Sequence, residues 1–229
     1  MAILTCISGV GAKAAACFLY EVAGKRIMLD LGMGPVPGQR PELTGVGRVD
    51  AVIISYQHPD HFGSLDLLGK IGLPPVYMTT PVLDVARPLI NSEAKIIELP
   101  IRGAASVENV PVLLGRTGHA PGGVWVHFPD SDGFTYMNDH KNDSLIYAYD
   151  GPPPADTIVV DASYGSDDQS MAAYVAAFDR VLDAEGSLLL PVPVAGRGME
   201  IAVHLLQSGR PVPAIDGPMR TLAEKLSSD

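Results

Sequence analysis

Residues 1–91 alternate short apolar runs with stretches rich in glycine, proline and polar residues. The apolar runs predict strands at Ile3–Ser8, Cys17–Val22, 26–30 and 50–55. Leucine and isoleucine recur at helical spacing over 64–71, a strand is expected at 76–79, and a proline in its first turn begins a helix at 81–91. This alternation of strands and helices is typical of an α/β fold.

The pattern changes near residue 95, where short apolar runs follow one another without helices between them. These runs predict a second sheet, with strands at 95–99, 105–114, 123–128, 134–137 and 144–149. Alternation then returns, with strands expected at 157–160, 187–192 and 212–215 and helices at 168–183 and 198–207. We therefore expect two sheets with helices outside them, in a single domain that spans residues 1–229.

Composition and charge narrow the class of protein. Hydrophobic residues make up 47% of the 229 positions and charged residues 18%, as in globular proteins. The formal net charge of -10 has the wrong sign for binding nucleic acid through the general surface, so such a contact would need a basic patch or a metal. No run approaches the roughly 20 apolar residues of a membrane span, and no signal peptide is visible. We expect a cytoplasmic protein without membrane contact, whose Cys6 and Cys17 are buried free thiols.

A histidine-rich loop directly follows the strand predicted at 50–55. His58, Asp60 and His61 lie within four residues of one another, so two imidazoles and a carboxylate can converge on one point. This mixture of ligands suits zinc, or a harder divalent ion such as manganese. The alternative is a polar turn that binds no metal.

Three further polar residues stand at predicted turns. His119 lies in the glycine-bracketed sequence GHAPGG at 118–123, and Asp139 ends the sequence YMND at 136–139. Asp30 ends the strand 26–30 beside a glycine-rich loop. A carboxylate at a strand end is often functional, but capping of a turn explains Asp30 equally well.

Taken together, these motifs resemble the metallo-β-lactamase superfamily, and within it the β-CASP nucleases, which include RNase J and the endonuclease that processes the 3′ ends of messenger RNA. The family's His-x-His-x-Asp-His loop aligns with 56–61, its Gly-His-Ser-Pro-Gly-like turn with 118–122 and its Tyr-x-Gly-Asp-like turn with 136–139. Further β-CASP-like stretches lie at 17–32, 161–165 and 196–201, and residues 196–229 resemble the start of the β-CASP insertion. The resemblance implies an αββα sandwich of two mixed sheets flanked by helices, incomplete at its C-terminus.

The resemblance also implies a metal centre of one or two zinc ions, with manganese as the alternative. His58 and His119 would bind the first ion, Asp60 and His61 the second, and Asp139 would bridge both. Asp60 would in addition be catalytic, because it would orient the water molecule that attacks the substrate. Asp30 would form a hydrogen bond with the ring of a ligand histidine without binding the metal itself.

The sequence departs from the family pattern at two ligand positions. Tyr56 stands where the family has its first histidine, and a phenol with an ordinary pKa of roughly 10 is a poor replacement for an imidazole at pH 7. The family's last histidine has no visible counterpart, because His204 lies in a predicted helix and suits packing. His140 and Tyr56 are candidate substitute ligands, although His140 is adjacent to Asp139 and extended neighbours point to opposite faces. His127 is expected to be structural.

These observations leave three functions open. The first is a metal-dependent hydrolase related to RNA or DNA phosphodiesterases, such as those of mRNA processing. The second is a catalytically degenerate relative that serves as a binding or assembly subunit, with a protein partner or as a homo-oligomer. The third is a small-molecule hydrolase acting on thioesters, lactones or cyclic nucleotides, since the fold alone does not select a substrate.

Overall fold

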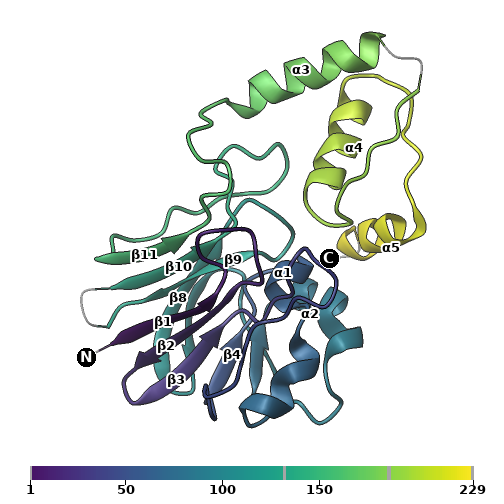
Figure 1. The fold of residues 1–229 in the computed structure, drawn as a ribbon. Coiled ribbons are helices and arrows are strands. Elements are labelled where there is room, and N and C mark those ends of the chain that lie inside the picture. Colours follow the sequence, from purple (N-terminus) through teal and green to yellow (C-terminus); the bar gives the residue numbers. More distant parts are fainter. Residues whose placement is uncertain (1, 131–132, 185–186, 228–229) are drawn as a thin grey trace.

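The computed structural model of the chain describes residues 2–130, 133–184 and 187–227 and contains two mixed β-sheets packed face to face (Figure 1). The first sheet has the strand order β1-β2-β3-β4-β5-β6, with antiparallel pairing from β1 to β3 and parallel pairing from β3 to β6. Its strands are β1 (Ile3–Ser8), β2 (Cys17–Val22), β3 (Lys25–Leu29), β4 (Ala51–Ile53), β5 (Val76–Met78) and β6 (Ile96–Glu98).

The second sheet has the order β11-β10-β9-β8-β7, and all its neighbours pair antiparallel except β10 and β11, which are parallel. Its strands are β7 (Gly103–Val107), β8 (Val110–Arg116), β9 (Val124–Phe128), β10 (Phe134–Asn138) and β11 (Thr157–Val160). The expected α/β class with two mixed sheets is confirmed.

Strands with continuous apolar sequences are buried on both faces, as their composition predicts. In β4, Ile53 faces the core between the two sheets, whereas Val52 faces the core between the first sheet and its helices. The inter-sheet core is rich in aromatic side chains, including Tyr20, whose ring lies 4.9 Å from that of Phe128. Burial of these rings stabilises the packing of the two sheets against each other.

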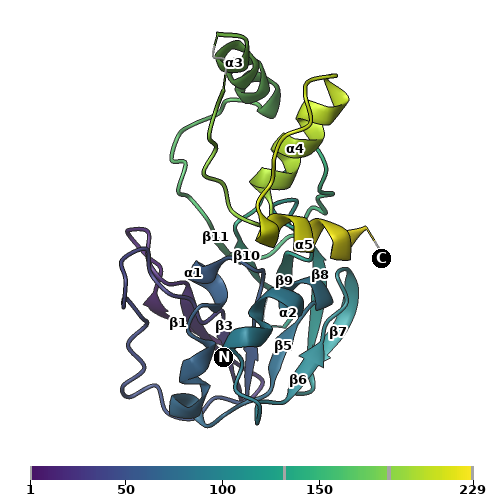
Figure 2. The same cartoon turned by 90° about the vertical axis from the view of Figure 1, so that its right-hand side faces the viewer.

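The helices fall into two groups. One group packs on the outer face of the first sheet and consists of α1 (Pro59–Phe62), the 3₁₀ helices η1 (Leu65–Ile71) and η2 (Arg87–Leu89), and α2 (Thr80–Ala86). The other lies beyond one end of the sandwich and consists of α3 (Met171–Ala184), α4 (Arg197–Gln207) and α5 (Gly217–Leu226) (Figures 1 and 2). Among the described residues α3 buries no side chain, while α5 approaches α2 through Lys225 and Asp84, 3.8 Å apart.

Several expected elements differ in the structure. Residues 64–71 contain a 3₁₀ helix, and the run at 105–114 is divided between β7 and β8 by a turn in which Glu108 and Asn109 have φ of 47° and 68°. The strand expected at 95–99 is β6, and it belongs to the first sheet because it pairs in parallel with β5. A helix, α5, was not expected, although Asp216 caps it by accepting a hydrogen bond from the backbone of Met219.

Three predicted strands are absent from the described residues. Residues 144–149 form bends with a single bridge from Tyr149 to Thr117, because the start of this segment instead donates hydrogen bonds to Glu200. Residues 187–192 and 212–215 have no strand pairing. Both contain or adjoin prolines, which lack the N–H needed for a strand ladder, and Leu189 in the first remains 93% exposed.

The two cysteines differ in how far their side chains are buried. Cys17 is a buried free thiol as predicted, and burial raises its pKa to about 12. Cys6 is free but exposed, so the prediction that it is buried was wrong. Its strand, β1, is at the sheet edge, where a bulge interrupts pairing with β2. In the described part of the chain, no helix combines the length and apolar character required to cross a membrane.

Candidate metal centre

The parallel pairing of β3 with β4 brings Asp30 beside Ser55 at the ends of their strands. Asp30 has a φ of 60°, a left-handed conformation that aspartate tolerates better than most residues, and its side chain is fully buried. The backbone N–H and the hydroxyl of Ser55 both donate to it at 2.7 Å, and the Tyr136 hydroxyl donates at 2.6 Å. Asp30 is therefore held rigidly from three directions.

Asp30 in turn holds His61. The carboxylate Oδ2 lies 2.5 Å from His61 Nδ1, and on the other side of the ring His61 Nε2 lies 3.6 Å from Asp139 Oδ1. Burial works against a charge on this ring, but the carboxylates of Asp30 and Asp139 outweigh it and raise the pKa of His61 to about 10. Asp30 thus fixes the orientation of the His61 ring.

The structure also brings His58, His119 and Asp139 together. One potential ligand atom from each lies within 4.8 Å of the other two. His58 Nδ1 is 3.5 Å from His119 Nε2, which is 3.8 Å from Asp139 Oδ2. These residues are separated by up to 81 positions in the chain, so only the folded structure makes them neighbours.

Tight turns position the side chains of His58, His119 and Asp139. His58 stands at the N-cap of α1, where the chain leaves β4. His119 follows Gly118, whose φ is 68° and whose missing side chain leaves room for the Lys141 carbonyl, only 2.0 Å from where a Cβ would be. Asp139 follows Asn138, which has a φ of 49° at the end of β10.

Hydrogen bonding and burial place these groups in the protonation states that a metal requires. The Ala195 carbonyl can only accept a hydrogen bond, so His58 Nε2, 3.1 Å away, carries the proton and Nδ1 keeps its lone pair facing His119. Burial lowers the pKa of His58 and lowers that of His119 to about 4. Burial opposes ionisation of Asp139, but hydrogen bonds with His61 and Tyr56 hold its pKa well below the usual range. Two neutral imidazoles and one carboxylate are a donor set that fits zinc.

Tyr56 fills the space between the histidines. Its ring centroid lies 4.3 Å from that of His61, 4.8 Å from His58 and 5.2 Å from His119. Its hydroxyl donates to Asp139 Oδ2 at 2.5 Å. Burial, followed by the nearby carboxylates, raises the pKa of Tyr56 far above its ordinary value, so the side chain is a neutral hydrogen-bond donor.

The predicted ligands Asp60 and His61 and the candidate substitute His140 lie outside this three-residue group. The Asp60 carboxylate forms an ion pair with Lys13, whose Nζ lies 3.2 Å from Oδ2 and whose pKa is raised chiefly by that carboxylate. His140 Nδ1 lies 3.4 Å from the Asn138 carbonyl oxygen, and His140 is not one of the three grouped residues. Sequence reasoning did not identify Lys13, which stands in a stretch of small residues with no recognisable motif.

The two remaining histidines are structural, as expected. His127 Nδ1 lies 2.9 Å from the Thr135 hydroxyl inside the second sheet. His204 Nε2 lies 2.9 Å from Asp179 Oδ1, which joins α4 to α3.

The segment before α4 covers the centre. Gly196 has a φ of 88°, and a Cβ there would lie 2.9 Å from the His119 carbonyl oxygen. The buried Glu200 anchors α4 by pairing with Lys141 at 3.3 Å and by accepting from Leu145 N at 2.9 Å. This attachment keeps the Ala195 carbonyl next to His58.

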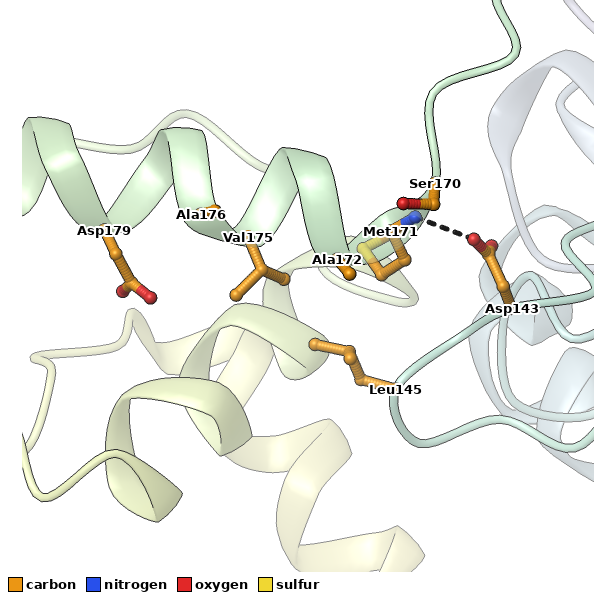
Figure 3. A pocket seen from close by; sticks show the side chains of 8 residues that line it. All are labelled: Asp143, Leu145, Ser170, Met171, Ala172, Val175, Ala176 and Asp179. Carbon is orange, nitrogen blue, oxygen red and sulfur yellow. Dashed lines mark hydrogen bonds between the residues drawn. The ribbon is translucent and has the colours of Figure 1, made fainter.

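An open cavity lies beside α3 (Figure 3). Its lining is mostly apolar, and the Met171 backbone N–H donates to Asp143 at its edge, at 2.8 Å. None of the three clustered ligand candidates lines this cavity, so the candidate metal centre is elsewhere.

Comparison with known proteins identifies the family. Residues 10–191 match the family described as the metallo-beta-lactamase superfamily, and the chain belongs to that superfamily.

Its relatives are distant β-CASP proteins. The chain is 26% identical to transcription termination factor FttA of Cenarchaeum symbiosum over 90% of its own length and 39% of the relative's. It is 25% identical to ribonuclease TTHA0252 of Thermus thermophilus, over 88% and 55% of the two chains. It is 27% identical to cleavage and polyadenylation specificity factor subunit 2 of Oryza sativa, over 89% and 33%. The chain therefore spans between a third and about half the length of these relatives.

Proposed function

We propose that the protein is a metal-dependent hydrolase related to the phosphodiesterases that cleave RNA or DNA. The observation that carries this proposal is the convergence of His58, His119 and Asp139 on one point, in protonation states suited to zinc or manganese. A bound ion would supply Lewis acidity, which activates water and stabilises negative charge on the substrate.

The chain's own residues have distinct roles in this proposal. His58, His119 and Asp139 hold the ion. Asp30 fixes the ring of His61, whose Nε2 faces Asp139 and restricts the position of that carboxylate. Asp60 is a carboxylate with 20% of its side chain exposed, and it would orient the attacking water.

The nucleic-acid substrate class is supported by the relatives, one of which is named a ribonuclease and another a transcription termination factor. The net charge of -10 disfavours binding through the general surface. Recognition of a nucleic acid would therefore depend on contacts near the metal centre, for example with Lys13 and with the exposed Arg197.

A direct assay tests this function. Purified protein supplied with zinc or manganese is incubated with fluorescently labelled RNA and DNA, and in parallel with thioester, lactone and cyclic-nucleotide substrates. Asp139→Asn and His119→Gln should lower metal-dependent turnover at least about 100-fold. His204→Gln, which alters a histidine outside the centre, serves as the matched control. Turnover that is unchanged in both centre variants would contradict the proposal.

A second candidate is a non-catalytic subunit. Two observations favour it, namely Tyr56 in place of the family's first histidine and the exposure of large apolar side chains such as Leu189 and Val212, at 93% and 79%. One relative is itself named as a subunit of a larger factor. This candidate predicts self-association or a partner in analytical ultracentrifugation together with no hydrolysis of any substrate above, and strong turnover by the isolated chain would exclude it.

A further inference from the structure

The environment of Tyr56 and Lys13 bears on how many ions the centre holds, an inference that rests on the proposed function. We propose that the centre binds a single metal ion through His58, His119 and Asp139, and that Tyr56 and Lys13 keep a second ion out. Tyr56 and Lys13 are then positioning residues, because each acts on a carboxylate that a second ion would need.

Tyr56 acts on Asp139. A carboxylate that bridges two cations needs free lone pairs for both, yet the Tyr56 hydroxyl donates to Oδ2 at 2.5 Å and His61 Nε2 faces Oδ1 at 3.6 Å. The phenol is fully buried and its ring is enclosed by three imidazoles, at centroid distances of 4.3 to 5.2 Å. It cannot swing away without disturbing those rings, so it occupies the place where another ligand would have to stand.

Lys13 acts on Asp60. Besides Asp139, the groups that the family resemblance assigns to a second ion are the Asp60 carboxylate and the His61 imidazole. The Lys13 ammonium lies 3.2 Å from Asp60 Oδ2 and already supplies the positive charge at that point. A divalent ion would have to displace the ammonium and would otherwise be repelled by it.

His61 reinforces this exclusion through geometry. Its Nδ1 is 2.5 Å from Asp30 and its Nε2 faces Asp139 at 3.6 Å, so both ring nitrogens are directed at carboxylates. Lys13 comes from the loop between β1 and β2, whereas Tyr56 follows β4. Two separate segments of the chain therefore act on Asp139 and Asp60, the two carboxylates that a second ion would need.

Metal content measured by elemental analysis tests the proposal without relying on activity. After equilibrium dialysis against excess zinc, and separately manganese, the unmodified protein should hold about one ion per chain. The double variant Tyr56→His/Lys13→Ala should hold about two, because it adds an imidazole, frees Asp139 and uncovers Asp60. The matched control Tyr164→His/Lys70→Ala changes an exposed tyrosine and an exposed lysine and should stay at about one.

The possible results separate this inference from the proposed function. No bound metal in the unmodified protein would defeat both, whereas two ions there would defeat only the single-ion inference. A double variant that remains at one ion would show that Tyr56 and Lys13 do not set the number.

Two single variants cover the case in which the double variant does not fold. Lys13→Ala changes a side chain that is 68% exposed and should bind a second, weaker ion as zinc is raised, and failure to do so would refute the role of Lys13. Tyr56→Phe removes the hydroxyl that donates to Asp139 Oδ2 and should likewise bind a second, weaker ion as zinc is raised, and a content that stays at one ion would refute the role of the hydroxyl.

Discussion

Replacement of Asp30 by asparagine should destabilise the metal-free protein more than any surface substitution. Asp30 is fully buried and interacts with Ser55, Tyr136 and His61 at 2.5 to 2.7 Å. Asparagine tolerates the left-handed backbone at φ 60° nearly as well as aspartate, so Asp30→Asn changes the hydrogen bonds with little added backbone strain.

The expected loss of stability follows from the hydrogen-bond partners of Asp30. The asparagine amide has one acceptor oxygen in place of two, and its NH₂ group would face donors. If the amide oxygen stays at Oδ1, where the Ser55 backbone N–H donates, the NH₂ group replaces Oδ2; the Tyr136 and Ser55 hydroxyls can then reorient, but the His61 ring loses its charged partner. A hydrogen bond to a charged group contributes about 1.5–3 kcal/mol, and the four bonds are not additive, so we expect a loss of about 3 kcal/mol in the free energy of unfolding.

Urea denaturation at pH 7, monitored by circular dichroism in the absence of metal, measures this loss. Asp66→Asn is the matched control, since Asp66 is paired with Arg40 at an exposed site where an ion pair contributes less than about 1 kcal/mol. A shift for Asp30→Asn no larger than that of the control would refute the idea that Asp30 organises the centre.

Three further outcomes are expected. The metal-free protein should lose stability as the pH falls from about 6.5 to about 4, because the buried, neutral His119 binds a proton less readily in the folded than in the unfolded chain. Urea denaturation of His119→Gln at the same pH values should lack this part of the pH dependence. Glu200→Ala should cost about 3 kcal/mol of unfolding free energy, because it removes a buried carboxylate and leaves the partly buried Lys141 ammonium without it. A change below about 1 kcal/mol in urea denaturation would count against this ion pair. One thiol per native chain, that of Cys6, should react quickly with Ellman's reagent and Cys17 only after unfolding; rapid reaction of both would contradict the structure.

Local sequence patterns determined much of the two-sheet core. The continuous apolar run around β4 predicted a strand buried on both faces, and Ile53 and Val52 do face different cores. The prediction failed at 187–192 and 212–215, where apolar composition suggested strands but the structure has no strand pairing. Strand formation requires a partner with free hydrogen-bonding groups, and composition alone does not reveal that partner.

The candidate site shows the same division. The spacing of histidines and carboxylates in the sequence identified His58, His119 and Asp139 as candidate ligands and Tyr56 as a departure from the family pattern. Only the tertiary structure brought the ligand atoms within 4.8 Å of one another and placed the Tyr56 hydroxyl against Asp139. It also brought Lys13, which belongs to no motif, to Asp60. Ligand chemistry is a property of residue types and is visible in the sequence, but distances between segments far apart in the chain depend on how the two sheets pack.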